Sequence, residues 1–114
     1  MLSAVLVTLW LGHSAAFAQG ATNSADVSKG HHLAVMVCSI CHVGAPDQER
    51  PPVLRPPAPP FAEIAQRPGT TEASLTKFIS TTHRGLDNPA GMPSPDLADY
   101  QVNEVVAYIL SLRK

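Results

Sequence analysis

The pattern of apolar and polar positions predicts a series of helices, the first of them near residue 27. Asp26 is well suited to cap an N-terminus, so we expect this helix to begin at Val27. Gly30 lies inside it, where glycine costs about 1 kcal/mol relative to alanine. Close approach of another backbone would account for that glycine. Apolar residues then follow one face of the helix: Leu33, Met36, Val37 and Ile40.

The second half of the chain predicts three more helices. A short one covers Phe61 to Gln66 and is ended by Arg67-Pro68-Gly69. Thr71 caps the next, which extends to about Thr82, and the last runs from about Asp99 to Leu112. Strand-like alternation is absent from the sequence, so the expected fold class is all-α with long loops. The apolar faces of the last two helices consist of Leu75, Phe78, Ile79 and Thr82, and of Val102, Val105, Val106, Ile109 and Leu112.

A proline-rich segment separates the first two predicted helices. Proline at this density excludes both helix and central strand, so we expect a loop stiffened by polyproline geometry over residues 45–60. The alternative is a linker between two domains, but too little chain lies on either side for two cores. The prolines of this segment are Pro46, Pro51, Pro52, Pro56, Pro57, Pro59 and Pro60.

The N-terminal segment differs from the rest of the chain. Residues 1–18 contain no Asp, Glu, Lys or Arg and end on Ala16-Phe17-Ala18, a pattern that signal peptidase accepts. Their apolar stretch is shorter than the roughly 20 residues that span a bilayer. We therefore expect a cleaved signal peptide over 1–18, a flexible leader over 19–25 and one periplasmic domain over 26–114. A retained membrane anchor or a buried helix is the alternative.

Charge and size narrow the possible functions. The net charge is −1, which excludes the strongly basic surface that nucleic acid requires. Only Lys29, Lys77 and Lys114 are lysines, so we expect partner choice to rest on shape and a modest apolar patch. A domain of this size is marginally stable without a metal, cofactor or staple. Its only cysteines are too close in sequence for a disulfide to contribute much.

The segment Cys38-Ser39-Ile40-Cys41-His42 has the spacing of a haem-attachment motif. Two thiols three residues apart on a helical turn can reach the two vinyl groups of one haem and form thioethers. His42 then lies under the ring, where its imidazole can bind iron. A thioredoxin-like site would require a βαβ pattern, and a zinc site would require four converging ligands. The sequence offers neither of these.

On these residues the chain resembles a class I cytochrome c. Asp26-Val27-x-Lys29-Gly30 and the C-x-x-C-H motif resemble the N-terminal helix of that family, and residues 104–109 resemble its C-terminal helix. The resemblance implies that these two helices cross with Gly30 at the contact and with Val105 and Tyr108 as its neighbours. It also implies short helices and long loops wrapped around one haem c and its iron.

The iron bound by His42 needs a sixth ligand, and Met92 is the only methionine after the motif. It lies in Gly91-Met92-Pro93, where the family resemblance places an axial methionine. Filling the core is the alternative role for Met92, and His83 is the rival ligand. Met36 is expected to be a core residue of the first helix.

Other residues near the motif have less specific roles. His31 and His32 are expected to be ordinary surface histidines. A metal-bound histidine usually donates its second ring N–H to an acceptor, and the resemblance implies a proline carbonyl here. Spacing leaves Pro59 and Pro60 as equal candidates. Tyr100 is either a surface residue or a cover for a haem propionate.

These residues together predict an electron carrier and not an enzyme. Ligation by His and Met raises the reduction potential relative to two histidines and leaves no open position on iron. The expected partners are redox proteins, a dehydrogenase as donor and an oxidase or other acceptor, with the chain acting as a freely diffusing monomer. One alternative is a dedicated cytochrome subunit of a periplasmic dehydrogenase or oxidase complex. The other is a ligand-binding or sensor haem protein.

Overall fold

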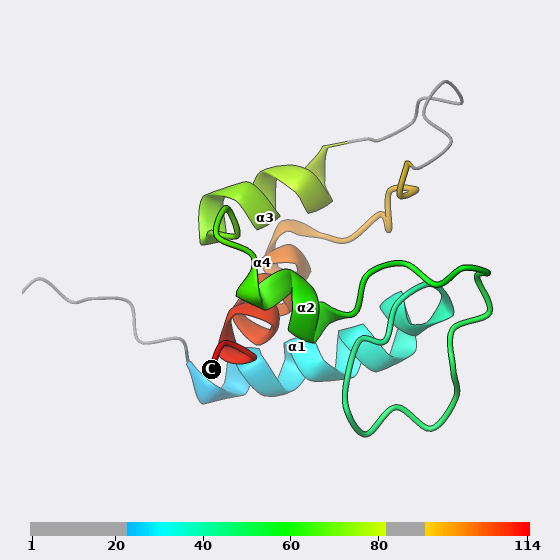
Figure 1. The fold of residues 1–114 in the computed structure, drawn as a ribbon. Helices are drawn as coiled ribbons and strands as arrows, with labels where there is room; N and C mark the ends of the chain where they lie inside the picture. The colour runs from blue at the N-terminus through cyan, green and yellow to red at the C-terminus, as the bar shows by residue number, and fades with distance from the viewer. Residues whose placement is uncertain (1–22, 82–90) are drawn as a thin grey trace, which may run out of the picture.

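The computed structural model describes residues 23–81 and 91–114. Its helices are α1 (Ser24–Met36), the 3-10 turn η1 (Cys38–Ile40), α2 (Phe61–Gln66), α3 (Glu72–Ser80) and α4 (Asp99–Ser111), arranged as Figure 1 shows. Within these two ranges the chain forms no strand. The expected all-α fold is therefore confirmed, and the predicted signal peptide at 1–18 lies outside the described residues.

Helix α1 begins earlier than the sequence pattern predicts. The side chain of Asn23 caps it by accepting a hydrogen bond from the backbone N–H of Ala25 at 3.2 Å. Asp26 lies inside the first turn, so its prediction as the N-cap was wrong. A carboxylate in the first turn still interacts favourably with the helix dipole. Ser24 and Ala25, which were assigned to the leader, belong to the helix.

The apolar residues at the end of α1 do not enter the protein core. Met36 is 64% exposed and Ile40 is 60% exposed, so the prediction of Met36 as a core residue was wrong. The helix ends at Met36, and the tighter turn η1 follows. The buried residues of α1 are Gly30 and Ala34, which lie one helical turn apart. The buried face of α1 is therefore the face that carries the small residues Gly30 and Ala34.

Gly30 lies where α1 meets α4. A Cβ atom at Gly30 would be 2.0 Å from the carbonyl oxygen of Glu104 and 2.7 Å from the Cβ of Tyr108. The predicted contact at Gly30 is confirmed with Tyr108 as a neighbour, and the nearest atoms are those of the Glu104 carbonyl group, which precedes Val105. Lys29 lies 3.6 Å from the Glu104 carboxylate beside this contact. The backbones of the first and last helices therefore pack directly against each other at Gly30.

The remaining helices match their predicted bounds closely. Thr71 caps α3 with a reciprocal pair of hydrogen bonds to Ser74, 3.1 Å and 2.8 Å long. Leu75 and Ile79 are buried as expected, whereas Phe78 is 47% exposed and was wrongly predicted on the buried face. Among the described residues no helix is long and apolar enough to cross a membrane.

The proline-rich segment is a loop fastened to the turn that contains the cysteines. The N–H of Val53 donates to the Ile40 carbonyl at 2.9 Å, and the N–H of Ala58 donates to the Cys41 carbonyl at 2.9 Å. These bonds fold the loop back onto η1, as the large loop in Figure 1 shows. The prediction of a wrapped loop in place of a linker is confirmed.

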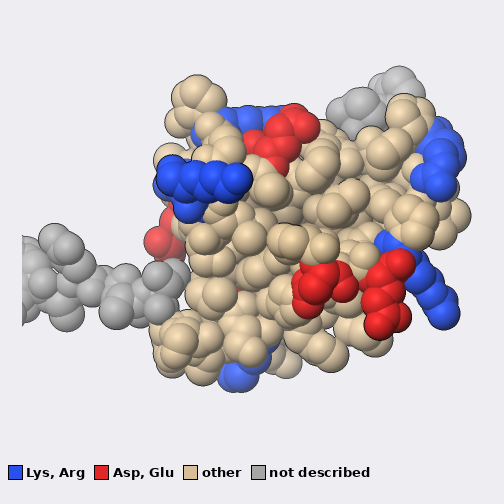
Figure 2. All heavy atoms as spheres, turned by 60° about the horizontal axis from the view of Figure 1, so that its bottom comes forward, with Lys and Arg blue, Asp and Glu red and all other residues tan. Residues whose placement is uncertain are grey.

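Charged side chains are spread thinly over the surface. Figure 2 shows groups of both signs on one face, with much uncharged surface between them. This agrees with a net charge of −1 in a chain of which 15% is charged.

One contact on this surface predicts a pH dependence. His31 Nε2 lies 2.7 Å from Asp47 Oδ1, and this hydrogen bond is the main reason why the pKa of Asp47 is lowered. Because its pKa is lower in the folded than in the unfolded chain, Asp47 stabilises the fold above the ordinary carboxyl pKa and less as the pH falls through its folded pKa. We expect Asp47→Asn to lower Tm slightly at pH 7 and not at pH values below the folded pKa. Thermal melts across this range test it, with the exposed Glu49→Gln as control; a difference that is constant with pH would contradict it.

Candidate haem site

The C-x-x-C-H segment folds into one tight turn. The N–H of Cys41 donates to the Cys38 carbonyl at 3.1 Å, and the N–H of His42 donates to the same carbonyl at 2.9 Å. Both thiols are free and partly buried. The turn therefore brings two thiols and one imidazole together within five consecutive residues, as attachment to one haem edge requires.

The surroundings of Cys38 favour a neutral sulfur atom. Burial, followed by the neighbouring Cys41, raises the pKa of the Cys38 thiol to about 11. At neutral pH Cys38 is consequently a thiol and a poor nucleophile toward disulfides, since thiolate is the reactive form. A thioether carries no charge, so burial does not penalise it in the same way. This environment suits a sulfur atom that is covalently bonded to carbon.

His42 is oriented by a hydrogen bond to the proline-rich loop. Its Nδ1 lies 2.7 Å from the carbonyl oxygen of Pro59, while the ring is 9% exposed and lies 5.2 Å from the ring of Phe61. A carbonyl can only accept, so Nδ1 carries a proton, and in the neutral imidazole the lone pair is then on Nε2. Nε2 is thus the nitrogen available to a metal. The structure selects Pro59 as the acceptor, and Pro60 serves as the N-cap of α2.

The backbone after His42 is held on two sides. The N–H of Phe61 donates to the Val43 carbonyl at 3.0 Å. A Cβ atom at Gly44 would be 2.8 Å from the carbonyl oxygen of Ala34. Gly44 therefore lets this segment lie directly on α1, a role that the sequence analysis missed. A glycine two residues after the motif was the only signal for it.

Met92 lies in the segment that leads into α4. It is half-buried, and residues 91–98 reach the helix from the side on which the proline-rich loop projects in Figure 1. Its rival His83 falls outside the described residues. The position of Met92 in the fold agrees with its predicted place before the last helix, while its role as a ligand stays a prediction. Tyr100, at the start of α4, is 65% exposed.

Three apolar side chains next to the cysteines are exposed. Val37, Ile40 and Val43 are 36%, 60% and 40% exposed. A bound cofactor would remove apolar surface of this kind from water. Two thiols, an imidazole with a free Nε2 and this apolar surround fit a covalently attached haem. No cluster of three or more His, Cys, Asp or Glu side chains in the described residues could hold a metal ion by itself.

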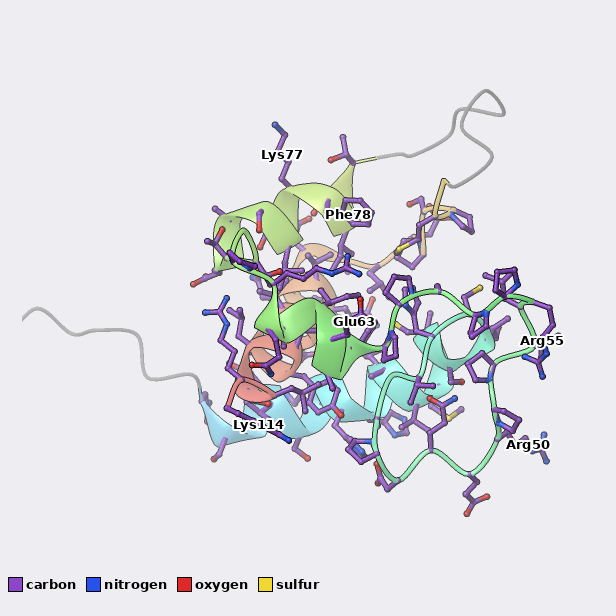
Figure 3. All side chains as sticks on the ribbon, in the orientation of Figure 1. Arg50, Arg55, Glu63, Lys77, Phe78 and Lys114 are labelled. Carbon is purple, nitrogen blue, oxygen red and sulfur yellow. The ribbon has the colours of Figure 1, made fainter. Side chains whose placement is uncertain are left out.

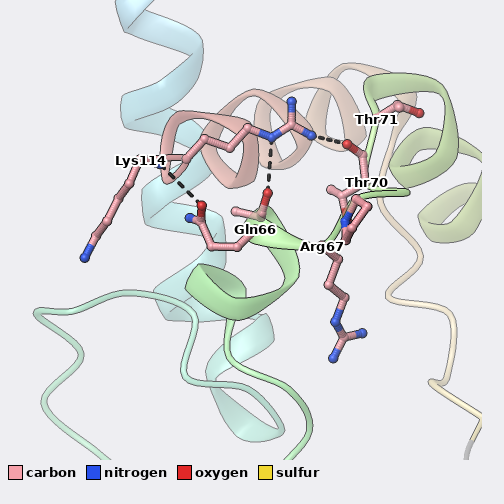
Figure 4. Close-up of a pocket in the computed structure, with 8 residues that line it drawn as sticks. Gln66, Arg67, Thr70, Thr71 and Lys114 are labelled. Carbon is pink, nitrogen blue, oxygen red and sulfur yellow. Dashed lines mark hydrogen bonds between the residues drawn. The ribbon is translucent and has the colours of Figure 1, made fainter.

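A pocket lies at the C-terminal end of α4, where hydrogen bonds join the last residues of the chain to α2 and the residues after it. Arg113 donates from Nε to the Ala65 carbonyl at 3.1 Å and from its guanidinium to the Thr70 carbonyl. Gln66 donates to the Leu112 carbonyl at 2.9 Å. Figure 4 shows Gln66 and Thr70 among the residues around the pocket. These bonds tie the C-terminal residues to α2. The pocket contains none of the residues of the C-x-x-C-H turn.

The family model for cytochrome c matches residues 27–113. The chain belongs to the cytochrome c family. Its cofactor is therefore haem c with iron, covalently bound, and its activity is haem-based electron transfer. This single domain has one C-x-x-C-H motif, which fits one haem. No curated protein and no solved structure matches the sequence significantly.

Proposed function

We propose that this cytochrome c transfers single electrons in the periplasm through one haem attached to Cys38 and Cys41, with His42 and Met92 as axial ligands. When bound, the haem supplies the exchange between Fe(III) and Fe(II). The observation that carries the proposal is the 2.7 Å contact between His42 Nδ1 and the Pro59 carbonyl, within a turn that also holds both thiols. That contact fixes the tautomer that a metal-binding histidine needs.

Hydrogen bonds and a ring contact hold the residues of this site in place. Pro59 accepts from His42, Phe61 packs against its ring, and the loop N–H groups bond to the carbonyls of Ile40 and Cys41. A ligand pair that is held firmly changes little between the two oxidation states. With His42 and Met92 both bound, no coordination position is left for oxygen or a substrate, so outer-sphere electron transfer is the natural activity.

The role of Met92 is tested by Met92→Ala in the exported holoprotein. We expect complete loss of the far-red absorption band that methionine gives with ferric iron, together with a lower reduction potential, because the thioether favours Fe(II). Visible spectra and a redox titration measure both effects. Met36→Ala removes an exposed methionine of α1 and should keep the band. A band that persists in Met92→Ala would refute this ligand, and a wild-type holoprotein that lacks the band would favour His83.

A dedicated subunit of a periplasmic oxidoreductase is the second form of this proposal. Val53 and Leu54, midway along the proline-rich loop, are 77% and 46% exposed, and a permanent partner could cover them. The two forms differ in hydrodynamic size. A carrier runs as a monomer after mild extraction of the periplasm, whereas a subunit co-purifies in fixed ratio with a larger enzyme.

A further inference from the structure

Val53 and Leu54, in the middle of the proline-rich loop, form an apolar tip. Val53 is 77% exposed, the highest value among the large apolar side chains of the described residues. Arg50 precedes the tip and Arg55 follows it, and Figure 3 places both residues at the outer edge of the loop. A small apolar area with a cation at each end thus projects from the body of the protein.

The tip is held against the turn that carries the cysteines. The N–H groups of Val53 and Leu54 both reach the carbonyl oxygen of Ile40, at 2.9 Å and 3.3 Å. That carbonyl belongs to the peptide bond joining Ile40 to Cys41. Only one hydrogen bond and a few covalent bonds therefore separate the tip from a sulfur proposed to be bonded to haem. Ile40, itself 60% exposed, extends the apolar area toward the motif.

The charged side chains next to the tip are two arginines, with one carboxylate before them in the sequence. The sequence from residue 50 to residue 62 contains Arg50 and Arg55 and no acidic residue. Arg55 donates to the backbone carbonyls of Pro52 and Leu54, which do not cancel its charge. Within the described ranges neither arginine pairs with a carboxylate; the ion pairs there are those of Lys29, His31 and Arg67. Glu49, which directly precedes Arg50, is the nearest acidic residue in the sequence.

We propose that this loop tip is the docking surface for an electron-transfer protein whose contact face has an apolar centre and a rim of carboxylates. The inference rests on the proposed function. Val53 and Leu54 would lose their contact with water against the apolar centre, and the two arginines would steer the encounter and set its orientation. One electron then passes between the partner and the haem, so that one is oxidised and the other reduced, with no bond made or broken.

The proposal is tested with small redox ions on the reduced holoprotein at low ionic strength. Hexacyanoferrate(III) is an anion that takes one electron and becomes hexacyanoferrate(II). Tris(phenanthroline)cobalt(III) is a cation that takes one electron and becomes the cobalt(II) complex. We expect the double variant Arg50→Gln/Arg55→Gln to react roughly threefold or more slowly with the anion and faster with the cation, and both changes to fade as salt rises.

The matched control is Lys77→Gln/Lys114→Gln, which changes the net charge equally at positions that Figure 3 shows well away from the loop. A control as slow as the loop variant would overturn the proposal, because net charge alone would then explain the effect. The redox-inert anion hexacyanochromate(III) gives a second readout. Its paramagnetic broadening of amide signals should centre on residues 50–55 of the holoprotein, and broadening centred elsewhere would also overturn the proposal.

The same measurements separate failure of electron transfer from failure of the docking surface. A wild-type protein that takes up no covalent haem, or that exchanges electrons with neither ion, contradicts the proposed function itself. A wild-type protein that exchanges electrons rapidly with both ions, at rates unchanged by the loop variant, contradicts only the docking surface.

Discussion

Gly30→Ala is expected to destabilise the folded protein by about 3 kcal/mol or more, and to reduce sharply the yield of holoprotein. The added Cβ would be 2.0 Å from the carbonyl oxygen of Glu104 and 2.6 Å from its carbonyl carbon. These are backbone atoms of α4, so they cannot move aside as the end of a side chain can. Overpacking in a well-packed interior typically costs 1–3 kcal/mol, and a contact with backbone belongs at or above the upper end.

The control for this substitution is Gly69→Ala, because nothing lies within 4 Å of a Cβ atom at Gly69. It adds the same methyl group and is expected to change stability by less than about 0.5 kcal/mol. Denaturant melts of the two holoproteins give the comparison. Equal stability of the two variants would show that α1 and α4 can separate at Gly30 without loss, which contradicts a tight helix crossing.

The sequence was sufficient for the helices whose signals are local. Phe61 to Gln66 was predicted with the observed bounds, since Pro68 and Gly69 end it by their own chemistry. Thr71 caps α3 because threonine can accept a bond from a residue three positions ahead. At the start of α1 two good caps compete, and Asn23 forms the bond that was expected from Asp26. Local chemistry cannot rank two such neighbours.

Which face of a helix is buried depends on its partner. Apolar spacing predicted a core stripe through Met36 and Ile40, yet α1 packs against α4 through Gly30 and Ala34, where small side chains allow close contact. The approach of the Glu104 carbonyl to Gly30 follows from the angle and register of that crossing. One-dimensional periodicity contains neither quantity.

In the candidate site, too, the local motif could be predicted from the sequence, whereas the long-range contact could not. The spacing of Cys38, Cys41 and His42 is contained in five residues, so the sequence alone could propose them as a unit. The choice of Pro59 over Pro60 depends on the path of a loop that leaves the motif and returns 17 residues later. Successive residues of an extended chain point their carbonyls in different directions, so only one of the two prolines can face the ring.

The core formed by residues 23–81 and 91–114 contains several small side chains. Of its buried apolar residues, Ala34, Ala45, Ala65 and Ala107 are alanines, which bury little apolar area. Meanwhile Val37, Ile40 and Val43 remain exposed beside the haem-attachment motif. A haem bound there would cover apolar area that the polypeptide leaves in contact with water. The stability of the fold is therefore expected to depend on the cofactor.

The substitution that tests this dependence is Cys38→Ser/Cys41→Ser, and its expected effect is loss of the cooperative unfolding transition. Serine keeps the size of the side chain but cannot form a thioether, so the haem loses its covalent attachment. Small domains have only about 5–15 kcal/mol of net stability, and little of it remains when the centre of the core is missing. Purified variant protein should show reduced far-ultraviolet circular dichroism, no near-ultraviolet signal and a broad, featureless melt.

Ile40→Ser provides the matched control, because it lies between the two cysteines and is 60% exposed. It preserves the spacing of the thiols and the position of His42, so covalent haem and a sharp melt are expected. Loss of haem in Ile40→Ser as well would mean that the turn itself, and not the thiols, had failed. A haem-free double variant that melts cooperatively, with well-dispersed amide signals, would refute the dependence of the fold on its cofactor, since the helices would then form a complete core by themselves.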